Sequence, residues 1–137
     1  MNDDKLGRLT SELLGGAVPD CLPDELDDVV GHIGSLLAAP GGPSLEQVRN
    51  ATTALIEARL LTPARELTLH WSNRRGFDAT IEKQLVQTLI ELGDLDEAEL
   101  RLADAVEQAR ALNTPQAIKE LSENQGQRGR IAKQRFV

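Results

Sequence analysis

The sequence matches itself under a 34-residue shift, and this self-similarity restricts the fold more than any other feature of the chain. Five identical pairs fall within ten positions: Leu55 and Leu89, Ile56 and Ile90, Glu57 and Glu91, Leu61 and Leu95, and Ala64 and Ala98. Each stretch spans the end of one predicted helix, a turn and the start of the next helix. A repeat of this length indicates a supersecondary unit whose copies stack on one another.

Helix is the only secondary structure that the residue pattern supports. Ala, Leu, Glu, Arg and Gln dominate, and no segment alternates apolar and polar residues with the period of a strand. Ser44 and Asp78 are predicted N-caps, and Gly93 is a predicted C-cap. We expect helices at about residues 4–14, 23–39, 45–60, 63–75, 79–92 and 96–112, with another starting near Pro115. The predicted fold class is all-α, with about six to seven helices in stacked antiparallel hairpins.

The second copy, residues 79–112, resembles the tetratricopeptide repeat, a helix–turn–helix unit with the same 34-residue period. The matching residues in this copy are Leu85, Leu89, Gly93, Leu95, Ala98, Leu102 and Ala105. The first copy, residues 45–77, matches at Val48, Ala51, Leu55, Leu61 and Ala64. The chain departs from the family pattern at Glu82, where Trp is usual, and at Arg110, where Pro is usual. The resemblance implies a right-handed α-solenoid.

The physical requirement behind the repeated alanine is close helix packing. Ala64 and Ala98 each lie one turn into the second helix of their pair, where a small side chain lets two helices approach. On this scheme residues 1–40 form N-terminal capping helices, and residues 41–137 form the repeats with a C-terminal capping helix. The sequence alone leaves open whether the chain is part of a longer repeat protein.

Composition and charge exclude several classes of partner. The net charge of -7 and the pI near 4.8 would repel a phosphate backbone, so we expect no nucleic-acid binding. No apolar run reaches the length of a membrane span, and a single cysteine indicates no disulfide framework. These features predict a cytoplasmic protein, which we expect to be bacterial, with no membrane association.

No residue pattern predicts a nucleophile of an enzyme. The lone thiol, Cys21, is far in sequence from both histidines, His32 and His70, and its acidic neighbours would keep the thiolate scarce. A half-buried loop cysteine is the favoured interpretation. We therefore expect a protein that is not an enzyme; a hydrolase that uses Cys21 and a histidine is the disfavoured alternative.

Metal and cofactor sites are equally unsupported. The two histidines lack the paired helical spacing of metal ligands, and His70 is interpreted as a packed or surface residue. Helix-dipole complement explains the acidic residues of one helix start, Asp24, Glu25, Asp27 and Asp28. Gly41-Gly42 lacks the Lys-Ser or Lys-Thr of a phosphate loop, so we expect no metal and no cofactor.

The resemblance implies a concave groove lined by the first helix of each hairpin. Its predicted partner-binding residues are Arg49, Asn50, Thr53, Lys83, Gln84 and Gln87, which the 34-residue shift relates to one another. Cations and amides could hold a peptide backbone or a terminal carboxylate, although solvated helix faces would have the same composition. The predicted function is an adaptor or scaffold that binds a protein or peptide. The alternative is a regulatory or sensor subunit of an enzyme complex, such as a protease system, whose chemistry lies in another chain.

Charge is also uneven along the chain. Arg128, Arg130, Lys133 and Arg135 give the last ten residues a charge of +4. This segment is interpreted either as a solvated helix end or as a docking segment for an acidic surface, including that of a second copy of the chain. Self-association therefore stays open.

Overall fold

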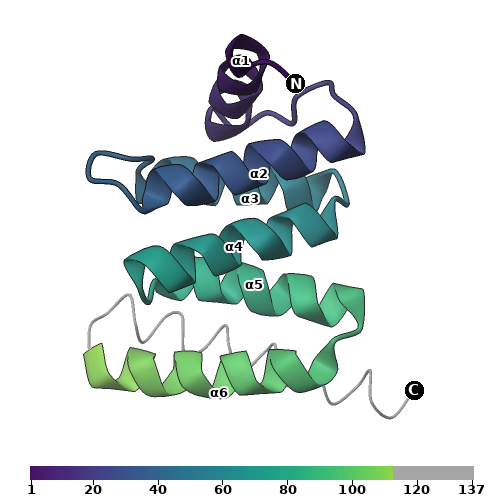
Figure 1. The fold of residues 1–137 in the computed structure, drawn as a ribbon. Coiled ribbons are helices and arrows are strands. Elements are labelled where there is room, and N and C mark those ends of the chain that lie inside the picture. The colour runs from purple at the N-terminus through teal and green to yellow at the C-terminus, as the bar shows by residue number, and fades with distance from the viewer. Residues whose placement is uncertain (113–137) are drawn as a thin grey trace. The chain divides into compact units, whose positions relative to one another are not determined.

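The computed structural model describes residues 1–112, and within that range it contains six α-helices and no strand (Figure 1). The helices are α1 (Asp3–Leu14), α2 (Pro23–Leu37), α3 (Leu45–Glu57), α4 (Leu61–Arg75), α5 (Ala79–Leu92) and α6 (Leu95–Leu112). The all-α class predicted from the sequence is confirmed. The chain divides into two compact units, Met1–Gly76 with α1 to α4 and Phe77–Val137 with α5 and α6.

Short-range signals in the sequence set several helix ends. The Ser44 hydroxyl accepts a hydrogen bond from the Gln47 backbone N–H, and the Gln47 side chain accepts one from the Ser44 N–H. The Asp78 carboxylate caps α5 by accepting from the Ile81 N–H at 2.9 Å. α2 and α3 end two and three residues earlier than predicted, and α4 begins at Leu61, two residues ahead of Pro63. Proline fits there because the N–H groups of a first helical turn have no acceptor within the helix.

The first unit is built from two helix pairs that pack on each other. α1 contacts α2 and α3, while α4 contacts both α2 and α3. In Figure 1, α2 and α4 lie side by side toward the viewer, with α3 behind them. The core between these helices consists of fully buried aliphatic side chains: Leu13, Val29, Ile33, Val48, Leu55 and Leu67. Burial of such side chains is the main stabilising contribution to a helix stack of this kind.

Arg75, the last residue of α4, fixes α4 to the end of α2. α2 has no basic residue in its own last turn. The Arg75 Nε donates to the carbonyl oxygen of Leu37 at 3.0 Å, and its Nη2 donates to that of Ala39 at 3.3 Å. A cation at this position complements the negative end of the helix dipole. The guanidinium therefore supplies from α4 the charge that α2 lacks.

The 34-residue period found in the sequence recurs in the helix boundaries. The two helix pairs related by this period are α3–α4 and α5–α6. Their first helices begin at Leu45 and Ala79, and their second helices begin at Leu61 and Leu95. The repeated alanines, Ala64 and Ala98, are both 0% exposed. The predicted burial of these small residues within their helix pairs is confirmed.

The turn inside each pair has the same hydrogen bonds at positions related by the 34-residue shift. In α3–α4, the Leu60 N–H donates to the Leu55 carbonyl at 2.9 Å; in α5–α6, the Asp94 N–H donates to the Leu89 carbonyl at 2.9 Å. The residue before each donor has a positive φ, 61° at Arg59 and 83° at Gly93. This arrangement is the left-handed helix C-cap that most often uses glycine.

Two predictions concern residues outside the described range. The C-terminal capping helix near Pro115 and the basic segment from Arg128 to Arg135 both lie beyond residue 112. The assignment of residues 1–40 as capping helices and residues 41–137 as repeats stays a prediction. The division into compact units falls elsewhere, after Gly76, and does not test these roles.

Candidate functional site

The predicted groove residues of the first unit lie on one side of α3. Arg49 is half-buried, whereas Asn50 and Thr53 are exposed. The Thr53 hydroxyl donates to the Arg49 carbonyl oxygen at 2.9 Å, within the same helix. Asn50 lies near the turn after α1, where its Cβ is 3.7 Å from the position that a Cβ on Gly16 would occupy.

The other three predicted groove residues lie on α5, in the second unit. Lys83 and Gln87 are half-buried, while Gln84 is buried with 8% of its surface exposed. The 34-residue shift thus places both sets on the first helix of a pair, as predicted. A single groove composed of both sets stays a prediction.

Cys21 lies in the connection between α1 and α2 and is half-buried. Burial raises the pKa of the Cys21 thiol, and the carboxylates of Glu25 and Asp20 raise it further. A raised pKa leaves little of the nucleophilic thiolate at neutral pH. The acidic neighbours named from the sequence therefore have the predicted effect, with burial as the larger cause.

Two other kinds of feature are absent from residues 1–112. In this range no three or more His, Cys, Asp and Glu side chains are grouped so that they could hold a metal ion. No helix in the described part of the chain combines the length and the apolar character of a membrane span.

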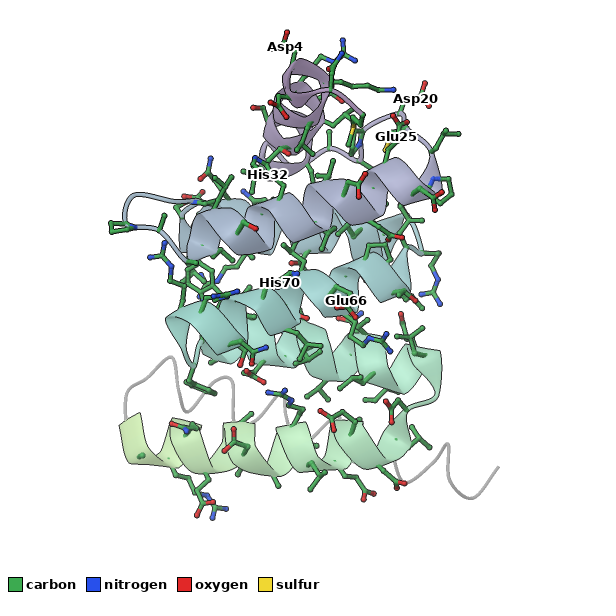
Figure 2. All side chains as sticks on the ribbon, in the orientation of Figure 1. Asp4, Asp20, Glu25, His32, Glu66 and His70 are labelled. Carbon is green, nitrogen blue, oxygen red and sulfur yellow. The ribbon has the colours of Figure 1, made fainter. Side chains whose placement is uncertain are left out.

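The first unit contains a hollow of about 380 Å³ between α2 and α4. From α2 it is lined by Asp27, Val30 and Gly31. From α4 it is lined by Thr62, Pro63, Glu66 and His70. Glu66 and His70 are labelled on α4 in Figure 2. The volume is near the lower end of the range for ligand pockets, so the hollow suits one side chain or a small molecule.

Two glycines of α2 lie at this hollow or against a residue that lines it. A Cβ on Gly34 would lie 2.7 Å from the Nδ1 atom of His70, so the absent side chain is what lets the imidazole ring rest against α2. A Cβ on Gly31, one turn earlier and on the wall of the hollow, would meet no atom within 4 Å. Gly34 therefore allows close packing, whereas Gly31 leaves open space.

Several polar groups of the hollow have no partner in the described part of the protein. The side chains of Asp27, Thr62 and His70 form no hydrogen bond or ion pair with another residue in the range 1–112. Glu66 forms one long ion pair, 3.4 Å from its Oε1 to the Nη2 of Arg65. Exposed pairs of this kind contribute little to stability. The hollow can therefore offer two carboxylates, a hydroxyl and an imidazole to a ligand.

Sequence reasoning missed this site because each residue has an ordinary explanation. The helix dipole accounts for Asp27, and packing accounts for His70, which its contact with Gly34 supports. The available signal was spacing: Thr62, Glu66 and His70 follow one another at intervals of four and share a face of α4. These three polar residues on one face of α4 do not by themselves show which other helix packs against that face.

Comparison of the chain with protein-family models, curated proteins and solved structures found no match.

Proposed function

We propose that this protein is a non-enzymatic interaction module, an adaptor or scaffold that binds a partner protein or peptide through a groove like that of tetratricopeptide repeats. The observation that carries the proposal is the recurrence of one helix–turn–helix unit. Helix starts, the N-cap bond, the left-handed turn residue and the buried alanine all repeat with the 34-residue period. Arrays of such units commonly present extended binding surfaces.

The chemistry of the predicted groove supports a peptide ligand. Arg49 and Lys83 are cations at equivalent positions of the α3–α4 and α5–α6 pairs. An amide side chain follows each of them in the sequence, Asn50 and Gln84. Cations bind carboxylates through charge-assisted hydrogen bonds, and amides can bind a peptide backbone. A segment with a terminal carboxylate is the ligand that this set of side chains suits best.

The test is binding of a purified partner, first identified by affinity capture and mass spectrometry. The double variant Arg49→Glu/Lys83→Glu should weaken binding at least about tenfold, since both charges that face the ligand are reversed. The matched control is Arg8→Glu/Arg110→Glu, which changes the net charge equally at exposed positions of α1 and α6. Equal affinity for the groove variant and the control would contradict the groove.

A further inference from the structure

We propose that the hollow between α2 and α4 binds the side chain of an arginine supplied by a partner protein. The hollow lies wholly within the first unit and contains none of the six predicted groove residues. The inference deepens the proposed function and rests on it in one respect only: that the ligand belongs to a protein.

Charge at the hollow favours a cation. Asp27 and Glu66 contribute two carboxylates, and Asp24 and Asp28 are exposed on the same helix as Asp27. The opposing influence is the start of α4, where Thr62 and Pro63 line the hollow. A helix N-terminus is equivalent to about half a positive charge, and Pro63 has no N–H to contribute. Arg65 also offsets part of the Glu66 charge through their 3.4 Å ion pair. Asp27 and Glu66 together with the nearby Asp24 and Asp28 still outweigh these positive contributions.

The remaining walls favour a guanidinium on an aliphatic stem. Pro63 is half-buried and offers an apolar surface along which the methylene groups of a long side chain can pack, and Val30, which is 3% exposed, adds a smaller apolar contact. The His70 ring provides a flat surface, and guanidinium groups stack on such rings. Arginine also presents five donors in one plane, which suits acceptors on two facing helices better than the point charge of lysine does.

The partner need not be known for the test. The uniformly ¹⁵N-labelled full-length protein would be titrated with N-acetyl-arginine N′-methylamide, an arginine with both ends blocked, while the amide signals of Gly31 and His70 are followed. We expect saturable shifts of both signals. Blocked lysine should bind more weakly, and free arginine no more tightly than the blocked form. Tighter binding of lysine would overturn guanidinium recognition, and tighter binding of free arginine would indicate an amino-acid site instead.

Charge-removing variants locate the ligand. Asp27→Asn and Glu66→Gln should each weaken binding about tenfold, as expected for loss of a charge-assisted hydrogen bond. Asp20→Asn and Glu46→Gln are the matched controls, because both carboxylates are exposed and neither lines the hollow. Equal weakening by the controls would show general attraction to an acidic surface and would overturn the site.

A steric variant separates the hollow from its surface charge. Gly31→Leu places a side chain into the open space without removing a carboxylate, and it should abolish binding. The helix tolerates the change, because leucine has a higher helix propensity than glycine. Undiminished binding by a folded Gly31→Leu protein would overturn the proposal. None of these variants changes Arg49 or Lys83. Loss of arginine binding at the hollow can therefore be told apart from loss of partner binding at the predicted groove.

Discussion

At the scale of single residues, two glycines one turn apart on α2 have different roles. Gly34 is buried against the His70 ring, whereas Gly31 borders open space. Glycine within a helix costs stability relative to alanine, so each must be explained by what a side chain would meet. Only at Gly34 does the structure provide an obstacle.

Alanine substitutions at these glycines should therefore have opposite effects. Gly34→Ala brings a Cβ to 2.7 Å from the His70 Nδ1. We expect the displaced ring to lower the free energy of unfolding by about 1–3 kcal/mol, more than the gain in helix propensity. Gly31→Ala should raise it by about 0.5–1 kcal/mol. Urea unfolding, followed by the fluorescence of Trp71, the single tryptophan, measures both.

The double variant Gly34→Ala/His70→Ala is the control for this interpretation. Removal of the imidazole gives the new methyl group space, so the effect of Gly34→Ala should be smaller in a His70→Ala background. An unchanged effect would mean that the ring is not the obstacle.

At the scale of elements, the turns within the two helix pairs show what a left-handed residue costs. Arg59 and Gly93 occupy equivalent positions with positive φ. Glycine adopts this conformation without strain, whereas a residue with a Cβ is strained by roughly 1–2 kcal/mol. The α3–α4 turn therefore carries strain that the α5–α6 turn avoids.

Replacement of Arg59 should relieve this strain. We expect Arg59→Gly to be more stable than Arg59→Ala by about 1 kcal/mol, a comparison in which both variants lack the arginine side chain. Gly93→Ala should lower stability by a similar amount. Chemical denaturation at one pH provides the free energies of unfolding. Equal stability of the two Arg59 variants would contradict the assigned strain.

A second feature at this scale is the link between α1 and α2 through Glu25. Its carboxylate forms an ion pair with Lys5 of α1 and accepts a hydrogen bond from the Leu22 N–H at 3.0 Å. Leucine has no side-chain acceptor to cap α2, and the Glu25 carboxylate instead bonds the N–H of this N-cap residue. The hydrogen bond with Lys5 lowers the pKa of Glu25 most, and that from Leu22 lowers it further.

This lowered pKa predicts a pH dependence of stability. The stabilisation is complete above the ordinary value of 4.5 and is lost as the pH falls through the folded-state pKa of Glu25. Lys5→Met should therefore lower the free energy of unfolding at neutral pH and have a vanishing effect in acid. Arg8→Met, at an exposed position of α1, is the control. NMR titration of the Glu25 carboxyl carbon should show a higher pKa in the Lys5→Met protein.

At the scale of the whole molecule, the 34-residue repeat predicts that equivalent substitutions in the α3–α4 and α5–α6 pairs have the same effect on stability. Ala64→Leu and Ala98→Leu insert a large side chain at equivalent, fully buried positions of the two helix pairs. Each should lower the free energy of unfolding by about 1–3 kcal/mol. Ala103→Leu, on the exposed side of α6, should change it by less than about 0.5 kcal/mol. Thermal unfolding followed by circular dichroism compares them. A neutral effect at either buried alanine would contradict the shared packing.

The all-α class, the cap at Ser44 and the turn at Gly93 were predictable because each depends on neighbours within a few residues. The equivalent positive φ at Arg59 was not predicted from its residue type, since arginine rarely adopts it. A positive φ at Arg59 can be inferred only from the 34-residue shift, which pairs Arg59 with the glycine at position 93. Helix ends near Ala39 and Leu60 were placed too late because fraying ends carry weak local signals.

The sequence by itself determined the helices, their order and the repeated unit, because caps, turns and the helical period act over a few positions. The tertiary structure decided which helix faces meet. Asp27 and Glu66 are far apart in sequence and line one hollow because α2 packs on α4. One point of that contact is the His70 ring, which fits against α2 where Gly34 has no side chain. Complementarity of this kind is a property of two surfaces, and neither helix specifies it alone.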